Sequence, residues 1–305
     1  MELAKVTALM KATALEVAIL TGHLVLYPSG IVSERLSTPA KPTAKPTGDP
    51  DTTPDPAPAA HPATSSASTA TSAERPADIP AEAPTPIAAG TRPVVLLHGF
   101  VDNRSVFVLL RRSLVRHGRD CVESLNYSPL TCDLRAAAEM LGRRVDEIRD
   151  RTGHAEVDVV GHSLGGLIAR YYVQRLGGDT RVRTLVTLGT PHAGTTVAPL
   201  ADAHPLVRQM RPGSEVLREL SGPAPGCRTR FVSFWSDLDQ VMVPVETARL
   251  DHPDLLVHNV RVSGIGHLAL PVHPTVAAGV REALDAGGPV VSGRRDEGPG
   301  ASSVA

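Results

Sequence analysis

Residues 161 to 166 read Gly161-His162-Ser163-Leu164-Gly165-Gly166 and match the pattern G-x-S-x-G. The motif follows an apolar run at residues 157–160 and precedes an amphipathic segment at residues 164–176. A sharp turn from a strand into a helix exposes the hydroxyl of such a serine. Gly161 and Gly165 let the neighbouring backbone approach without a Cβ clash. We therefore predict that Ser163 is a catalytic nucleophile and not merely the N-cap of a glycine-rich turn.

Short apolar runs alternate with helical patterns on both sides of this motif, between residues 93 and 286. Strands are predicted at residues 94–97, 121–125, 157–160, 182–188, 231–235 and 255–262. Helices are predicted at residues 103–117, 134–150, 164–176, within 205–220 and at 275–284. Continuous Val and Leu runs separated by helices indicate a mainly parallel sheet with both faces covered. The sequence therefore predicts an α/β fold with about six strands and helices on both faces.

Three segments of the chain resemble the small bacterial lipases and esterases of the α/β-hydrolase superfamily, in the class 2 lipase-like branch. They are GHSLGG at residues 161–166, His98-Gly99-Phe100 after a predicted strand, and Gly189-Thr190-Pro191-His192-Ala193-Gly194. The resemblance spans about residues 93–285 and implies a minimal version of the α/β-hydrolase fold. In this fold the catalytic residues follow the chain order serine, acid, histidine.

The resemblance implies where the base and the acid lie. His267 comes after the last predicted strand, in a loop of small residues that can fold toward Ser163, and is expected to act as general base and then as acid. The family pattern places the acid just before an apolar tripeptide and a proline, which favours Asp239 over the alternative, Asp237. Five other histidines are rivals for the role of base, namely His192, His204, His252, His258 and His273. Of these, His258 is expected to be a packing or exposed residue, His273 a capping or solvated residue, and His192 a structural or pocket-lining residue.

Acyl transfer passes through an anionic tetrahedral intermediate, which two backbone N–H groups stabilise. One is the amide after the nucleophile, at Leu164. In the resembled lipases the second belongs to the residue after His-Gly, here Phe100. His98 and Gly99 are expected to shape that loop, with His98 as a buried histidine bonded to the backbone. Asp102 and Asn103 fit the cap of the following helix.

The implied reaction is two-step hydrolysis of a carboxylic ester through an acyl-enzyme, without a metal or an organic cofactor. The segment between Gly189 and Arg228 is the expected place for a lid or an acyl pocket, although its apolar residues also fit a helix that packs on the sheet. Three alternatives use the same triad, namely a thioesterase, an acyltransferase and an amidase. A non-catalytic binding module is disfavoured because Ser163, Asp239 and His267 are all present.

The composition divides the chain into four parts. Residues 1–33 are mostly apolar, and residues 34–92 are rich in Pro, Ala, Thr and Ser without apolar periodicity. Such a segment buries too little surface to offset its ordering entropy, so a disordered linker is predicted. The catalytic domain is assigned to residues 93–286, and residues 287–305 are predicted to be a disordered tail.

The N-terminal segment resembles a signal sequence or a membrane anchor, with Lys5 and Lys11 before its most apolar part. Residues 6–27 are therefore expected to attach the protein to a membrane, and the enzyme to be membrane-associated or extracellular. Glu16 and His23 within this stretch weaken that interpretation. The alternatives are a helix that docks on the catalytic domain and a cytoplasmic protein.

Charge and cysteine content limit the other partners. The formal net charge of -1 lacks the basic surplus that a nucleic-acid partner requires. Three cysteines are too few and odd in number for a disulfide framework, and none lies in a metal-binding pattern. Cys121 fits a buried small apolar residue. A bridge between Cys132 and Cys227 is left open, because both lie beside turn residues.

Overall fold

The computed structural model describes residues 13–14, 21, 90–100, 102–127, 133–197 and 204–286, together with the backbone of residues 301–304. The chain divides into two units, one of Met1–Ser33 with Ile87–Ala305 and one of Glu34–Pro86. Every described residue belongs to the first unit. The predicted linker, apart from its last three residues, and most of the predicted N-terminal anchor lie outside the described residues.

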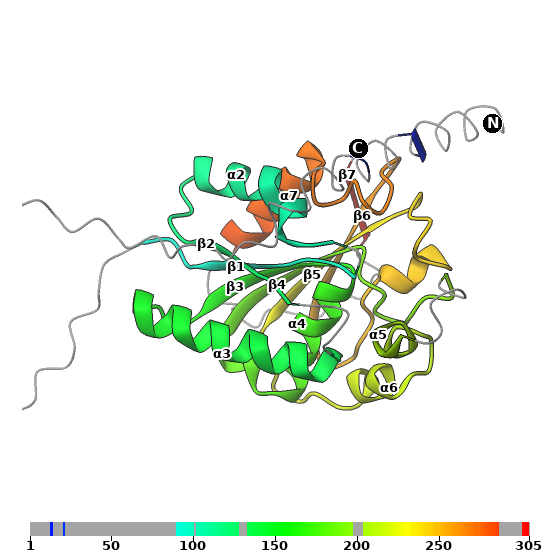
Figure 1. Cartoon of the computed structure of the whole chain (residues 1–305), viewed down its shortest axis with the longest axis horizontal. Helices are drawn as coiled ribbons and strands as arrows, with labels where there is room; N and C mark the ends of the chain where they lie inside the picture. Colours follow the sequence, from blue (N-terminus) through cyan, green and yellow to red (C-terminus); the bar gives the residue numbers. More distant parts are fainter. Residues whose placement is uncertain are drawn as a thin grey trace, which may run out of the picture. The chain divides into compact units, whose positions relative to one another are not determined.

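A parallel sheet in the order β2-β1-β3-β4-β5-β6-β7 forms the centre of the catalytic domain (Figure 1). Its strands are β1 (Val94–Leu97), β2 (Val122–Leu125), β3 (Val157–His162), β4 (Val182–Leu188), β5 (Arg230–Ser236), β6 (Leu256–Val262) and β7 (Ala301–Val304). The first six correspond to the predicted strands, so the predicted parallel α/β architecture is confirmed.

The seventh strand is a difference from the sequence prediction. β7 belongs to the segment predicted to be a disordered tail, and it pairs in parallel with β6. An edge strand such as β6 presents a row of backbone N–H and C=O groups that can pair with further chain. The segment Ala-Ser-Ser-Val has no apolar run, so side-chain pattern alone does not indicate it.

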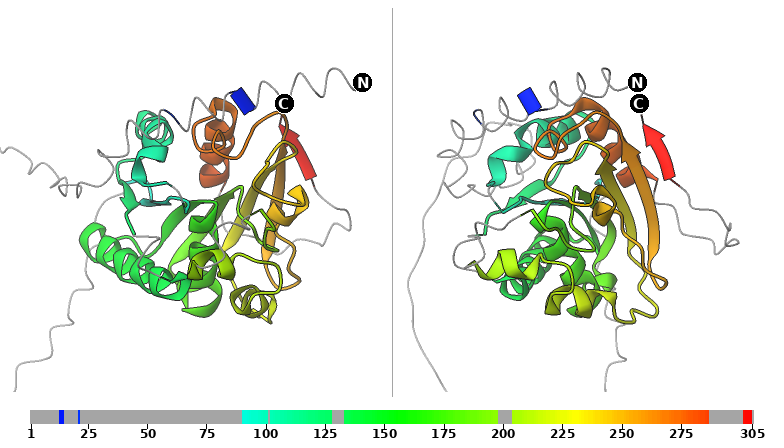
Figure 2. Two further views of the ribbon diagram at one scale, coloured as in Figure 1. Left: turned by 45° about the vertical axis from the view of Figure 1, so that its right-hand side comes forward. Right: turned by 90° about the vertical axis from the view of Figure 1, so that its right-hand side faces the viewer.

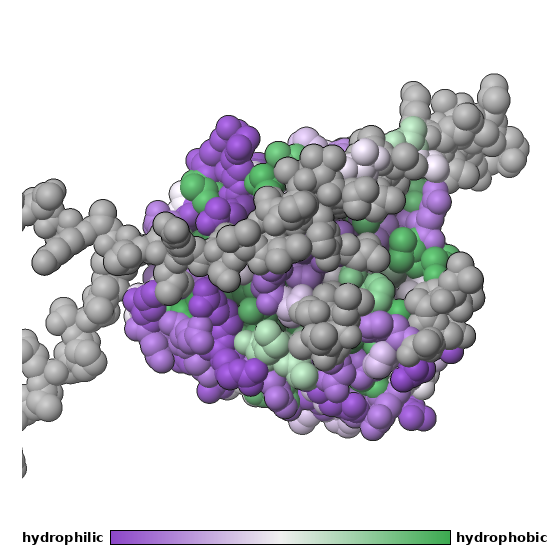
Figure 3. All heavy atoms as spheres, in the orientation of Figure 1, coloured by the Kyte–Doolittle hydropathy of each residue, from purple (hydrophilic) through white to green (hydrophobic). Residues whose placement is uncertain are grey.

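Helices cover both faces of the sheet (Figures 1 and 2). They are η1 (Arg104–Phe107), α2 (Val108–Arg116), α3 (Leu134–Thr152), α4 (Leu164–Arg175), η2 (Gly178–Thr180), α5 (Pro205–Gln209), α6 (Glu215–Ser221), η4 (Val245–Ala248) and α7 (Pro274–Asp285). α2 and α7 lie on one face, and α3 and α4 lie on the other (Figure 1). Over α3 the outer surface is mostly hydrophilic (Figure 3), as expected for an amphipathic helix.

Two hydrophobic clusters, one on each face, explain why the strands are apolar at nearly every position. Val95 and Leu97 of β1 belong to the cluster formed with α3 and α4. Val94 and Leu96 belong to the cluster formed with α2 and α7. Successive side chains of a strand point to opposite faces, so a sheet covered on both faces needs an unbroken apolar run.

A buried carboxylate lies near the N-terminal end of β3. Asp158 is fully buried, and its two carboxylate oxygens accept hydrogen bonds from Nε and Nη2 of Arg183, both at 3.2 Å. Nη1 of Arg119 lies 3.6 Å from Asp158 Oδ2. Arg119 also pairs with Asp285 at 2.6 Å, and Arg183 donates to the carbonyl of Leu284. These contacts join the end of α7 and the turn after α2 to the sheet.

Neither a disulfide nor a membrane span occurs within the described residues. Cys121 and Cys227 are free thiols and partly exposed. Cys132 itself lies outside the described residues. Among the helices that the structure describes, none has the length and apolar character needed to cross a membrane.

Candidate active site

Ser163 lies at the sharp turn between β3 and α4. Its φ of 53° and ψ of -121° make it the one non-glycine residue with positive φ among those described. Such backbone strain is costly for a residue with a Cβ and is typical of functional sites. The Ser163 amide donates to the carbonyl of Leu188 at 2.9 Å, which ties the turn to the end of β4. The predicted strand-to-helix context of the serine is therefore present.

Glycines are required around this turn because backbone atoms approach each other closely. A Cβ on Gly161 would lie 2.5 Å from the amide nitrogen of Gly166. A Cβ on Gly165 would overlap the carbonyl oxygens of Leu97 and His98, at the end of β1. The first turn of α4 thus packs directly on main-chain atoms, and the N-terminus of a helix favours negative charge beside it.

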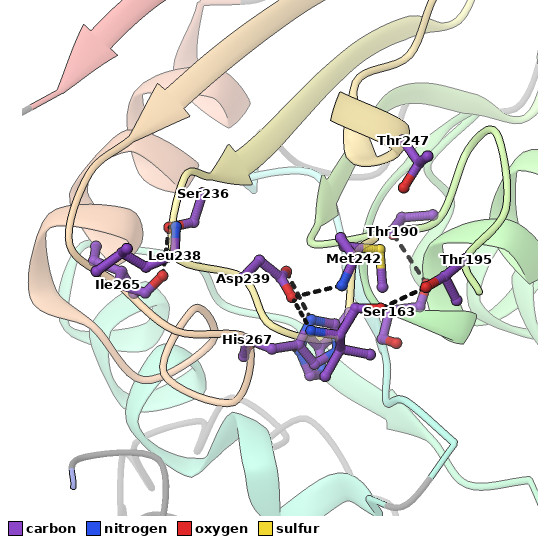
Figure 4. Close-up of polar contacts among 12 residues, drawn as sticks. Ser163, Thr190, Thr195, Ser236, Leu238, Asp239, Met242, Thr247, Ile265 and His267 are labelled. Carbon is purple, nitrogen blue, oxygen red and sulfur yellow. Dashed lines mark hydrogen bonds and ion pairs between the residues drawn. The ribbon is translucent and has the colours of Figure 1, made fainter. Parts of the chain in front are cut away.

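His267 and Asp239 form a buried pair beside the turn (Figure 4). Nδ1 of His267 donates to Oδ2 of Asp239 at 2.8 Å, and the two residues are 4% and 2% exposed. Oδ1 of Asp239 accepts the amides of Val241 and Met242, at 2.9 and 3.0 Å. The carboxylate is thus held by two backbone donors and its remaining oxygen orients the imidazole.

Asp237, the alternative acid, takes a different role. Its carboxylate accepts the Gly264 amide at 3.1 Å and pairs with Arg261 at 2.9 Å. It therefore shapes the loop that leads to His267 and does not contact the imidazole. Asp239 is the carboxylate that the structure places beside His267.

The ring of His267 lies at the turn that carries the nucleophile. Its centroid is 4.8 Å from that of His162, the residue immediately before Ser163. A Cβ on Gly189, where φ is 54°, would lie 3.1 Å from His267 Nδ1 and 3.0 Å from Asp239 Oδ2. The chain therefore brings together the three residues predicted as a triad, from the loops after β3, β5 and β6.

The loop after β1 holds the second predicted oxyanion donor. His98 is buried, its Nδ1 donates to the Gly99 carbonyl at 2.9 Å, and burial lowers its pKa. Because the peptide unit is planar and trans, fixing the Gly99 carbonyl also fixes the opposite direction of the Phe100 N–H. The ring of Tyr127 stacks on His98 with centroids 4.3 Å apart, and its hydroxyl donates to the His98 carbonyl at 2.5 Å. Leu164, the other predicted donor, is the first residue of α4.

One of the two predicted cap residues has a partner that sequence reasoning missed. Asn103 caps η1 as predicted, because its side chain accepts the amide of Ser105. Asp102 instead pairs with His162, with 3.1 Å between Oδ2 and Nδ1. The signal is weak in sequence, because His162 looks like the variable position of the motif and its partner lies sixty residues away.

The remaining histidines lie in structural positions. His204 and His273 accept N-terminal amides of α5 and α7 as caps, and His258 lies exposed on β6. His252 Nε2 is 3.0 Å from the Gly222 carbonyl. His192 is buried between Thr187 and Arg170, and burial lowers its pKa well below the usual value. Within the described ranges no group of three or more His, Cys, Asp or Glu side chains could hold a metal ion.

The segment expected to form a lid contains two short helices. Most of its apolar side chains are buried in the cluster with α3 and α4, namely Leu206, Val207, Met210, Val216, Leu217 and Leu220. Packing on the domain therefore explains them, while Leu200 lies outside the described residues. Phe100 makes an edge contact with His204, with ring centroids 5.0 Å apart, so the oxyanion loop touches the start of α5.

The order of the strands and the helices on both faces give the chain the α/β-hydrolase fold. Lipase B of Aspergillus fumigatus superposes with a TM-score of 0.58 at 19% identity, over 68% of this chain and 55% of that one. A lipase of Bacillus licheniformis in its mature form superposes with a TM-score of 0.53 at 17% identity, over 67% of this chain and 95% of that one. Identities this low show a shared fold.

Part of the catalytic domain is also similar in sequence to known enzymes. Residues 93–240 match the family model described as palmitoyl protein thioesterase. Triacylglycerol lipases of Pseudarthrobacter phenanthrenivorans and Burkholderia plantarii are each 31% identical over 119 residues, or 36% of this chain. Those matches cover 36% and 32% of the two lipases, so this chain spans about a third of their length. The chain therefore has the α/β-hydrolase fold, and part of its sequence is similar to lipases and to the palmitoyl protein thioesterase family.

Proposed function

We propose that the protein is a serine carboxylic-ester hydrolase with Ser163, His267 and Asp239 as its triad. The observation that carries the proposal is the buried hydrogen bond of 2.8 Å between His267 and Asp239, next to a serine held at a φ of 53°. An ester or lipid with an acyl chain is the proposed substrate.

The reaction follows from the geometry of the three loops. His267 accepts the proton of the Ser163 hydroxyl as the oxygen attacks the ester carbonyl, and Asp239 stabilises the imidazolium that forms. The amides of Leu164 and Phe100 donate to the tetrahedral oxyanion, and each lowers the activation free energy by a few kcal/mol. His267 then protonates the leaving alcohol, and an acyl-enzyme remains. In the second step His267 deprotonates a water molecule as its oxygen attacks the acyl carbon. The bond from that carbon to Ser163 Oγ then breaks, His267 returns the proton to Oγ, and the acid is released.

The test is a hydrolysis profile on p-nitrophenyl esters of graded chain length, with fluorophosphonate labelling of the same preparation. We expect hydrolysis and labelling at Ser163, and the loss of both in Ser163→Ala. Ser233→Ala is a matched control, because Ser233 is also buried but donates to the Ala248 carbonyl at 2.9 Å within the fold. A folded protein that hydrolyses these esters without labelling at Ser163 would contradict the proposal.

The match to the thioesterase family model supports a second candidate, hydrolysis of thioesters on the same triad. An oxygen ester and a thioester of one acyl chain distinguish the two. A thiol has a lower pKa than an alcohol, so it can leave as the thiolate anion. Thioester cleavage therefore depends less on protonation of the leaving group by His267. A kcat/KM for the thioester at least tenfold above that of its oxygen analogue would assign the thioesterase function.

We also propose that the N-terminal segment attaches the enzyme to a membrane surface. The apolar residues 6–27 support this location. The amide nitrogen of Gln240 donates to the Thr13 hydroxyl at 3.1 Å, which supports the competing idea that the segment docks beside Asp239. Cell fractionation of the full chain and of a truncated protein beginning at Ala88 distinguishes them. Membrane attachment requires that only the full chain sediments with membranes.

A further inference from the structure

A second histidine–carboxylate pair lies directly beneath the nucleophile. Nδ1 of His162 is 3.1 Å from Oδ2 of Asp102, and Nε2 is 3.2 Å from the carbonyl oxygen of His267. The ring of His162 is fully buried, and Asp102 is 6% exposed. The pair is separate from His267–Asp239, although the two imidazole rings face each other with centroids 4.8 Å apart.

The two partners of His162 are both hydrogen-bond acceptors. A carboxylate oxygen and a backbone carbonyl oxygen accept, and neither has a hydrogen to give. A neutral imidazole has one N–H, so it can satisfy one of these contacts, whereas an imidazolium has two. A buried polar group left without its partner is destabilising, because its lost hydrogen bond to water is not replaced. The geometry therefore favours a ring with protons on both nitrogens, whose charge Asp102 balances.

The pair connects the three loops that build the active site. Asp102 belongs to the oxyanion loop, His162 to the nucleophile turn, and the accepting carbonyl to His267 itself. Gly99 packs against this junction, since a Cβ there would lie 3.0 Å from Asp102 Oδ2, 3.2 Å from Ser163 Cβ and 3.3 Å from His162 Nδ1. Substrate would lie above Ser163, so His162 acts through the backbone.

We propose that Asp102 and a doubly protonated His162 are positioning residues that hold the backbone of His267 and the oxyanion loop in register with Ser163. The proposal rests on the proposed hydrolase function and adds a source of pH dependence to it. The titratable groups around His162 are Asp102 and His98 from the loop after β1, His267 from the loop after β6, and Asp239 behind His267.

Opposite protonation states are then required of two neighbouring histidines. His267 must be neutral to accept the serine proton, which limits the rate in acid. His162 must keep its second proton to hold the His267 carbonyl, which limits the rate in alkali. When His162 loses that proton, the bond to His267 is lost and kcat falls, while KM changes little because no contact to substrate is removed.

The first test is the replacement of His162 by side chains that keep different parts of its hydrogen bonding. His162→Gln keeps an N–H near the position of Nε2 at every pH, so we expect kcat within tenfold of wild type and no alkaline decline. His162→Leu removes both donors and is expected to lower kcat about a hundredfold with KM within twofold. Asp102→Asn removes the balancing charge and is expected to move the alkaline decline to lower pH.

A direct measurement keeps this proposal separate from the hydrolase function. Proton NMR of the full chain, with His162→Gln as the assignment control, should show two ring N–H signals for His162 near neutral pH. His252→Gln is the matched control for activity, because His252 is also buried and bonded to a backbone carbonyl, that of Gly222. It should leave the pH profile unchanged.

A single ring N–H signal at His162 would overturn the proposal, even in an active enzyme. The same follows if His162→Gln keeps the wild-type alkaline decline, or if His162→Leu keeps full kcat. Two N–H signals in a protein without esterase or thioesterase activity would instead contradict the proposed function and leave the protonation of the pair established.

Discussion

The two ends of strand β3 both hold buried polar groups, but they differ in how those groups are balanced. At the N-terminal end the carboxylate of Asp158 meets two guanidinium groups, and the residue has ordinary backbone geometry. At the C-terminal end Ser163 has a strained backbone and a side chain that none of the hydrogen bonds described above satisfies. The six residues of β3 thus connect a cluster of paired charges at one end to a serine with a strained backbone at the other.

This difference shows how a parallel sheet separates stability from chemistry. Reactive groups collect at the carboxyl ends of the strands, where loops and helix N-termini converge. Charged groups at the opposite end can be fully paired, because no substrate has to reach them. We therefore expect substitutions at the two ends to have nearly independent effects on kcat and on the free energy of unfolding.

The largest expected effect on activity is that of the nucleophile. Ser163→Ala should lower kcat by on the order of 10⁶-fold, because triad members act as a unit. The free energy of unfolding should change by less than about 0.5 kcal/mol, since no packing is lost. Steady-state kinetics and urea unfolding check both values. His267→Ala should give a similar loss, and the double variant should be no worse than either single one.

A smaller loss is expected at the acid. Asp239→Asn should reduce kcat about 10⁴-fold, because the amide no longer selects the imidazole tautomer that can accept the serine proton. Asp237→Asn, in the same loop, is the matched control and should reduce kcat by less than about tenfold. The opposite ranking of the two measured rates would transfer the orienting role to Asp237.

Substitution of Asp158, at the N-terminal end of β3, should lower the free energy of unfolding rather than the activity. Asp158→Asn leaves Arg119 and Arg183 without their buried counter-charge, and such a loss costs about 3–5 kcal/mol. We expect the midpoint of urea unfolding to fall while kcat stays within twofold at temperatures where the variant is folded. Asp285→Asn is the control, since this carboxylate is 72% exposed and should cost less than about 1 kcal/mol. A large drop in kcat for folded Asp158→Asn would contradict the idea that the two ends of β3 affect stability and activity independently.

The smallest effect concerns acid stability. Burial lowers the pKa of His192, so the folded protein keeps this ring neutral where the unfolded chain protonates it, below about pH 6.5. The unfolded state then binds more protons, and the free energy of unfolding decreases as pH falls, by at most about 1.4 kcal/mol for each pH unit. Urea unfolding between pH 7.5 and 5 should show a shallower decrease in His192→Gln. His117→Gln, at an exposed position, should retain the wild-type dependence.

Much of the fold follows from local sequence. The strand at residues 182–188 is predicted residue for residue, because its apolar run begins and ends at polar turns. The predicted helix within residues 205–220 is two helices, α5 and α6, separated by a turn in which Gly213 has a φ of 72°. The order of residues along the chain, the strands before them and the family pattern indicate Asp239 and His267, which the fold brings within 2.8 Å of each other.

The missed features depend on contacts between distant residues. Asp102 has the composition of a helix cap, and only the fold brings it against His162. In the same way β7 forms because the outer edge of β6 is open to pairing, not because its own residues favour a strand. Local patterns describe what a segment prefers, and they cannot report which partner the rest of the chain supplies.

The contact between Gly165 and the end of β1 has a consequence for directed evolution. Because main-chain atoms of the two segments approach closely there, a side chain added at Gly165 would push the first turn of α4 away from the end of β1 and so change the spacing between the Leu164 and Phe100 amides. A library that varies residues 97–100 or 161–166 should therefore yield mostly inactive clones. Changes of acyl preference should arise instead at His204, whose ring touches Phe100 at the start of α5.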